Sequence, residues 1–206
     1  MRTRPVLMSS PCAMLAHMTV ISHLSWRADG VHDLPIEGRI DQVSRSQAIA
    51  VIAHHRQRDK LGVRYINHPA EVAYRFDPID ETAEHCAAWL HDVLEDTSVR
   101  RATLELANIH PEIIEIVGVL TWQKGQGHEY YERIRENPVA LRVKYADITH
   151  NTDPSRTAGL TLADREHLDA KYRRALDLLG MPWPDHFMVG QVGGTIVGNP
   201  ALYEFG

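Results

Sequence analysis

Four residues in the middle of the chain have the side chains of a metal centre. They are two histidines, an aspartate that directly follows the second of them, and a further aspartate: His68, His91, Asp92 and Asp147. Two imidazoles and two carboxylates suit borderline-to-hard divalent ions and leave coordination positions open for water and substrate. A closed structural zinc site is not expected, because the chain has only two cysteines and they are far apart.

Asp147 is expected on the buried side of a helix. It lies seven residues after Ala140 and four after Val143, so it shares the apolar face that these residues define. An ionised carboxylate on such a face is costly unless it is paired or bound to a cation. A buried salt bridge with Lys144 or Arg142 would stabilise the carboxylate of Asp147 as a metal ion would. Asp147 alone therefore does not distinguish a metal site from a salt bridge.

The other candidate ligands are expected at helix ends. His91 and Asp92 close a strongly apolar stretch, and His68 precedes Pro69. Proline disfavours helical backbone in the residue before it, which suits His68 to capping the helix that follows. Each of these residues alone is compatible with a cap or an exposed pair. Only the joint pattern indicates that several helices direct donor atoms at a common point.

A second acidic pair follows the first candidate pair. Glu95 and Asp96 come four residues after His91 and Asp92, which on a helix is one turn further along the same faces. Acidic side chains near the C-terminus of a helix are disfavoured by its dipole. A pair that costs stability without a structural benefit indicates function, and the alternative is a solvated acidic cluster without a role.

The elements that must position these residues are helices. From about residue 43 to 179, apolar residues recur at spacings of three and four, and no long strand-like alternation appears. We expect one apolar helical stripe over 83–94 and a helix that opens at Asn137 and Pro138. A last long helix over 162–179 ends at Gly180. The fold class is therefore predicted to be all-α.

The 206 residues suit one compact domain. We expect a helical domain over 43–180, an irregular N-terminal arm over 1–42 and a C-terminal extension over 181–206. The net charge of −5 argues against holding nucleic acid through its phosphates, and no apolar run approaches the ~18 residues that span a membrane. Two distant cysteines make no disulfide framework, which favours a reduced, cytoplasmic setting. A homo-oligomer is left open.

Three segments resemble the hydrolase domain of the RelA/SpoT alarmone enzymes, which belong to the HD superfamily of metal-dependent phosphohydrolases. They are YINHPAEVA at 65–73, AWLHDVLEDT at 88–97 and VKYADITHN at 143–151, and they look most like the small stand-alone relatives of that domain. The likeness covers about residues 45–180. It implies an HD-domain helical bundle with a divalent ion, usually manganese, held by His68, His91, Asp92 and Asp147.

The resemblance also implies roles for the residues around the ion. Glu95 and Asp96 would orient and activate the attacking water. The arginine that the family usually has directly before Lys60 is Asp59 here, and the arginine after its Ala-Asp pair is Ile148. These departures leave the nucleotide preference open. Substrate contacts are expected from residues that match the family or add positive charge: Arg58, Lys60, Tyr65, Lys144 and Asn151.

The activity that the resemblance implies is a manganese-dependent removal of 3′-pyrophosphate from a guanosine alarmone of the ppGpp type. Two alternatives stay open. The first is an HD-type phosphatase that acts on another nucleotide or phosphoester, such as a nucleoside monophosphate or NADPH. The second is a non-enzymatic, metal-stabilised helical module that binds a partner.

Overall fold

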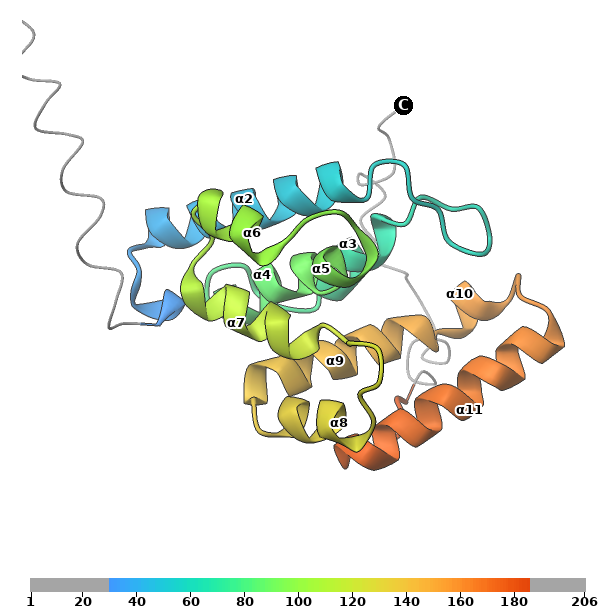
Figure 1. Cartoon of the computed structure of the whole chain (residues 1–206). Helices are drawn as coiled ribbons and strands as arrows, with labels where there is room; N and C mark the ends of the chain where they lie inside the picture. Colours follow the sequence, from blue (N-terminus) through green and yellow to red (C-terminus); the bar gives the residue numbers. More distant parts are fainter. Residues whose placement is uncertain (1–29, 186–206) are drawn as a thin grey trace, which may run out of the picture.

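The computed structural model describes residues 30–185, and over this range the fold is all-α, which confirms the predicted class (Figure 1). No strand occurs in this part of the chain, and none of its helices combines the length and apolar character needed to cross a membrane. The elements are η1 (Val31–Asp33), α2 (Ile36–Ala53), α3 (Asn67–Ala73), α4 (Thr82–Leu90), α5 (Val93–Asp96), α6 (Arg101–Leu106), α7 (Pro111–Leu120), α8 (His128–Arg135), α9 (Pro138–Asn151), α10 (Pro154–Thr157) and α11 (Leu162–Leu179).

The expected terminal segments fall largely outside the described residues. Of the arm over 1–42, only residues 30–42 are described, and α2 already begins at Ile36, ahead of the expected boundary at residue 43. Of the extension over 181–206, only the first five residues are described. The described part of the arm is therefore mainly helical.

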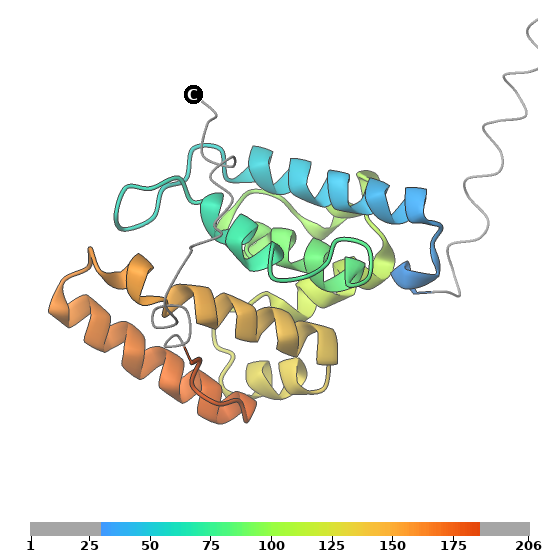
Figure 2. The same ribbon diagram turned by 180° about the vertical axis from the view of Figure 1, so that it is seen from behind.

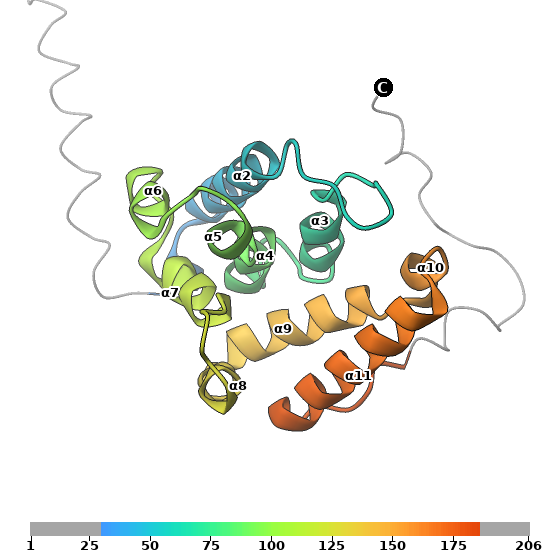
Figure 3. The same ribbon diagram turned by 45° about the vertical axis from the view of Figure 1, so that its right-hand side comes forward.

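Helix α4 is the centre of the bundle. It contacts α2, α3, α7 and α9, and all of its residues are buried. Figure 3 shows it enclosed by these neighbours. Small residues such as Ala83, Cys86 and Ala87 are completely buried here. The buried polar side chains of α4 have partners, as buried polar groups require: Glu84 accepts a hydrogen bond from Arg142, and the Nδ1 of His85 contacts the carbonyl of Phe76. The site residues at the end of α4 are therefore attached to a completely buried helix.

Helix α9 lies between two groups of helices. It contacts α3, α4 and α7 on one side and α8 and α11 on the other, as the view from behind also shows (Figure 2). Its start agrees with the sequence signal: the Oδ1 of Asn137 accepts a hydrogen bond from the amide of Ala140 at 2.9 Å, and Pro138 is the first helical residue. The residues on the side of α9 that contacts α3 and α4 therefore lie close to these two helices.

The single helix expected over 83–94 is interrupted at its most polar point. The Nδ1–H of His91 donates to the carbonyl of Ala88 at 2.6 Å, which is the acceptor that the amide of Asp92 would use in an uninterrupted helix. Helical bonding resumes where the amide of Asp96 donates to the carbonyl of Asp92 at 2.8 Å. His91 and Asp92 consequently lie at a corner between α4 and α5.

The expectation that His68 caps a helix is wrong. His68 is the second residue of α3 and is buried, and Pro69 follows it inside the same first turn. Proline is tolerated there, because the amide proton that it lacks would have no partner within the helix. His68 is therefore held by regular helix backbone on both sides.

The C-terminus of α11 depends on a residue in the left-handed region, and a substitution there tests this. Gly180 has φ 68° and follows the last helical residue, as the sequence predicts. The variant Gly180→Ala places a Cβ at positive φ and should lower the free energy of unfolding by roughly 1 kcal/mol. Urea unfolding monitored by circular dichroism measures the change.

Gly118 provides the matched control with the opposite expected sign. It lies inside α7, and a Cβ added to it meets no atom outside that helix closer than 3.9 Å. Alanine has the better helix propensity, so Gly118→Ala should raise stability by up to about 1 kcal/mol. Equal shifts for the two variants would contradict the role assigned to Gly180.

Candidate metal centre

The four candidate ligands meet at one point, although they come from three parts of the chain. The Nε2 of His68 in α3 lies 3.2 Å from the Nε2 of His91 and 3.5 Å from the Oδ2 of Asp92 at the α4–α5 corner. The same nitrogen lies 3.1 Å from the Oδ1 of Asp147 in α9. The Nε2 of His91 is 3.0 Å from Asp92 and 3.8 Å from Asp147. One donor atom of each residue thus faces a common centre.

These separations suit a shared cation. An ion with bonds of about 2.1 Å places neighbouring atoms of its octahedron about 3 Å apart. His68, His91 and Asp92 offer donor atoms that all lie within 4.8 Å of one another, and Asp147 adds a fourth through its Oδ1. Only 4% of Asp147 is exposed, and a buried carboxylate needs positive charge beside it. The donor set therefore fits a divalent ion.

The surroundings of the centre favour positive charge. Although burial opposes it, the carboxylate of Asp92 raises the pKa of His91 to about 9. The Nζ of Lys144 donates to the Oδ2 of Asp147 at 2.8 Å, so the salt bridge that the sequence allows is present. Despite burial, this pairing holds the pKa of Asp147 well below and that of Lys144 well above its usual range. The Oδ1 of Asp147 still faces the two histidines.

Each aspartate of the centre is oriented by a further hydrogen bond. The hydroxyl of Tyr65 donates to the Oδ2 of Asp92 at 2.6 Å. The side-chain amide of Asn151 donates to the Oδ1 of Asp147 at 2.6 Å. Outer hydrogen bonds of this kind fix the orientation of metal ligands and tune their basicity. Tyr65 and Asn151 therefore contact the candidate ligands and also line the adjoining cavity.

Each histidine of the centre also has a partner behind its ring. The Nδ1–H of His91 donates to the carbonyl of Ala88, so Nε2 is the nitrogen that faces the centre and that would give up its proton to bind an ion. The Nδ1 of His68 lies 2.7 Å from the Nδ1 of His150, and the two ring planes are nearly parallel, with centroids 4.9 Å apart. Both rings thus present their Nε2 atoms to the same point.

A cavity of about 510 Å³ opens over the candidate ligands. Its wall combines three kinds of side chain with the donor set. The acids are Glu95 and Asp96, and the cations are Lys144, Arg156 and Lys171. The aromatic rings are those of Trp122, Tyr130, Tyr131 and Tyr172. A cavity that combines candidate metal ligands, acids and cations is suited to an anionic substrate that reacts with water.

Glu95 and Asp96 lie in this cavity beside the donor set. The main-chain amide of Trp122, in the connector between α7 and α8, donates to the Oε2 of Glu95 at 2.9 Å. Burial raises the pKa of both carboxyl groups, so each accepts a proton more readily than a solvated acid does. The connector over 121–127 thus reaches the site through its backbone.

No protein-family model and no curated protein matches this sequence. Solved structures do match it, among them that of a metazoan ortholog of SpoT that hydrolyses ppGpp. That chain is 24% identical, the match covers 67% of this chain and 85% of the other, and the TM-score is 0.53. The two chains share a fold. The resemblance read from the three sequence segments is therefore confirmed at the level of the fold.

The five expected substrate contacts are divided between two cavities. Tyr65, Lys144 and Asn151 line the large one. Arg58 and Lys60 line a smaller cavity of about 280 Å³, which is bordered by the loop between α2 and α3 and by α10 and α11. Tyr65 and Asn151 line both cavities, so the two adjoin.

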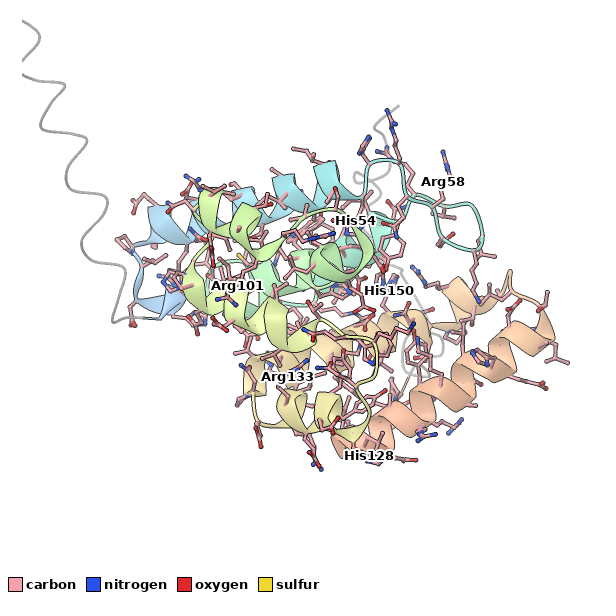
Figure 4. The ribbon with its side chains drawn as sticks, in the orientation of Figure 1. His54, Arg58, Arg101, His128, Arg133 and His150 are labelled. Carbon is pink, nitrogen blue, oxygen red and sulfur yellow. The ribbon has the colours of Figure 1, made fainter. Side chains whose placement is uncertain are left out.

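Arg58 and Lys60, two of the three cations of the smaller cavity, already have partners. The Nη1 of Arg58 donates to the carbonyl of Gly62 at 2.7 Å, and Figure 4 shows Arg58 on the loop that projects from the helical bundle. The Nζ of Lys60 lies 3.5 Å from the Oδ1 of Asp164. Because these pairs are exposed, water competes for them and they hold the cations weakly.

Asp59, at the position of the family's usual arginine, shapes the loop. Its Oδ1 accepts hydrogen bonds from the amides of Leu61 at 2.9 Å and Val63 at 3.0 Å. Its Oδ2 lies 3.9 Å from Arg156 of α10, which lines both cavities. The guanidinium that borders the two cavities thus comes from α10 and faces an acid in the loop.

Several residues of the site were not found from the sequence. His150 follows Asp147 by three residues, so helical spacing places the two on adjacent parts of one face and could have selected it. Arg156 and Lys171 come from α10 and α11. Their presence in the cavity depends on how α10 and α11 pack against α9, which no local pattern reveals.

Proposed function

We propose that the protein is a divalent-metal-dependent phosphohydrolase that releases pyrophosphate from the 3′ position of a guanosine alarmone. The observation that carries the proposal is the composition of the large cavity, in which four convergent donors share a wall with Glu95, Asp96 and Lys144. His68, His91, Asp92 and Asp147 would hold the ion. When bound, a divalent ion supplies Lewis-acid stabilisation of phosphoryl charge and activates water, and manganese is our proposed ion.

Glu95 and Asp96 orient the attacking water and take its proton. Glu95 is held in place by the amide of Trp122, and its raised pKa suits a group that gains a proton during the reaction. Asp96 lines the same cavity, and burial likewise raises its pKa. Two acids at this position allow one to position the water while the other accepts the proton.

Cations of the cavity bind the phosphate groups. Lys144 is fixed by its bond to Asp147, so it presents a positive charge without reorganisation when the phosphate arrives. Arg156 and Lys171 add charge further along the wall. Asn151, on the border of the smaller cavity, contacts the ribose or a phosphate. The bond that breaks joins the 3′ oxygen of the ribose to phosphorus, and the oxygen of water takes its place.

A second candidate is hydrolysis of another nucleotide or phosphoester, and two observations favour it. Asp59 is bound to two loop amides and supplies no cation where the family has an arginine. Ile148 is completely buried, so the other missing arginine is replaced by a core residue. Both changes remove guanidinium groups, which are well suited to phosphate and to stacking on a base.

A substrate panel tests the proposed function. The full chain is stripped of metal with a chelator and assayed with ppGpp, a nucleoside monophosphate and NADPH, with and without added manganese. We expect pyrophosphate and guanosine diphosphate from ppGpp, with at least a roughly 100-fold loss of rate when the metal is removed. Products are identified by ion-exchange chromatography and phosphorus NMR.

The other outcomes of the panel are equally definite. Faster release of single phosphates from another substrate would replace the alarmone assignment with the second candidate. Binding of manganese without hydrolysis of any compound in the panel would overturn the enzymatic proposal and favour the non-enzymatic helical module.

A further inference from the structure

His150 has no part in the proposed chemistry, yet it is in direct contact with a candidate metal ligand. Its Nδ1 lies 2.7 Å from the Nδ1 of His68, and the two rings are nearly parallel, with an interplanar angle of 13°. Figure 4 shows His150 between α3 and α9, on the side of the bundle where these helices meet. The pair therefore links the helix that carries His68 to the helix that carries Asp147.

The chemistry of the His68 ring determines what His150 must do. The Nε2 of His68 faces His91, Asp92 and Asp147 at 3.1–3.5 Å. A neutral imidazole that binds a metal through Nε2 carries its proton on Nδ1. That proton needs an acceptor, because the His68 side chain is only 3% exposed and an unpaired buried donor is costly.

The contact at 2.7 Å accommodates one proton between the two Nδ1 atoms. If His68 donates it, the Nδ1 of His150 is the acceptor and His150 carries its own proton on Nε2. The opposite arrangement would put the proton of His68 on Nε2 and block the lone pair that a metal needs. The hydrogen bond and the metal-binding form of His68 thus require each other.

His91 achieves the same result by a different route. Its Nδ1–H donates to the carbonyl of Ala88. A backbone carbonyl can only accept, so the direction of this hydrogen bond is fixed. The acceptor of His68 is a side chain, and it lies in α9 three residues after Asp147. One histidine of the centre is therefore fixed by its own helix and the other by a neighbouring helix.

We propose that His150 is a positioning residue that holds His68 in its metal-binding tautomer and orientation, and that it thereby sets the affinity of the centre for divalent ions. The inference rests on the metal site of the proposed function, but it requires no particular substrate. Mutation of such an outer hydrogen-bond partner typically lowers metal affinity by about 10- to 100-fold.

The test compares variants with and without an acceptor at position 150. His150→Phe keeps a flat ring but accepts no hydrogen bond, whereas His150→Gln restores an acceptor through its side-chain oxygen. Thr149→Val is the matched control in the same helix, since the hydroxyl of Thr149 donates to the carbonyl of Tyr145 at 2.7 Å and not to the centre. Manganese binding to the metal-stripped full chain is measured by titration calorimetry.

We expect His150→Phe to bind manganese about 10- to 100-fold more weakly than the wild type. His150→Gln should recover most of this loss, and Thr149→Val should bind as the wild type does. Circular dichroism establishes that the variants fold. If the phenylalanine variant does not, His150→Leu replaces it as the variant without an acceptor. Wild-type affinity in a folded variant without an acceptor would overturn the inference.

A second measurement observes the hydrogen bond itself. Nitrogen NMR of the metal-free wild type should show a scalar coupling between the Nδ1 atoms of His68 and His150, which only an N–H···N hydrogen bond transmits. Absence of this coupling would overturn the inference. Neither readout involves a nucleotide, so a lack of hydrolysis with the expected affinities would reject the proposed activity alone. Hydrolysis with unchanged affinities would reject the role of His150 alone.

Discussion

Asp147→Ala is expected to abolish hydrolysis, with kcat/KM lower by at least roughly 1,000-fold, and to remove tight manganese binding. The Oδ1 of Asp147 lies 3.1 Å from His68 and 3.8 Å from His91, so the variant removes one of the two negative donors. Lewis-acid stabilisation worth several kcal/mol is lost with the ion. Initial rates on ppGpp with excess manganese, together with calorimetric titration of the metal, measure both effects.

The competing explanation is that Asp147 only neutralises Lys144. Removing one partner of a buried pair costs about 3 kcal/mol or more, because the other charge is left without compensation. The double variant Asp147→Ala/Lys144→Met removes both charges, and the single variant Lys144→Met completes the cycle. We expect the double variant to regain stability but not manganese binding. If manganese binding returned as well, Asp147 would be a salt-bridge partner and not a ligand.

The second large effect is expected from the acidic pair. Glu95→Gln and Asp96→Asn should each lower kcat by about 10²- to 10⁴-fold, the range for loss of a general base, while manganese affinity changes little. Glutamine can still accept the hydrogen bond that the amide of Trp122 donates to Glu95, so the side chain keeps its place. The measurements are kcat and KM on ppGpp at saturating manganese, and metal titration of each variant.

Glu105→Gln is the control for this pair, since Glu105 is exposed and forms an ion pair with Arg101 away from the cavity. It should leave kcat unchanged. A variant of Glu95 or Asp96 that no longer binds manganese would place that carboxylate among the ligands instead. An unchanged kcat would remove it from the mechanism.

Much of the fold could be predicted because its signals are local. The cap at Asn137 and the left-handed Gly180 each define a helix end through the preferences of one or two residues. The small apolar residues of α4 predict a buried helix, although its buried polar residues Glu84 and His85 depend on partners from other segments. The sequence alone gives no distance between α3 and α9. The prediction that His68 and Asp147 converge therefore depends on the motif.

The features that could not be predicted depend on single contacts or on packing. A bond from the ring of His91 to the carbonyl of Ala88 breaks the helix, and residue spacing does not reveal such a bond. Proline disfavours helical backbone in the residue before it, so Pro69 predicts a helix boundary at His68. Pro69 lies instead in the first turn of α3, where proline is tolerated, and His68 is inside the helix. Arg156 reaches the cavity only because α10 folds back toward the loop that contains Asp59.

Helix α9 brings together a candidate ligand, its charge partner and two outer hydrogen-bond partners: Lys144, Asp147, His150 and Asn151. Adding or deleting one residue in an α-helix turns everything beyond that position by about 100°. A substitution here removes one interaction, whereas an insertion between Lys144 and Asn151 would misalign several at once. The length of this eight-residue stretch is therefore constrained more strongly than the identity of most of its residues.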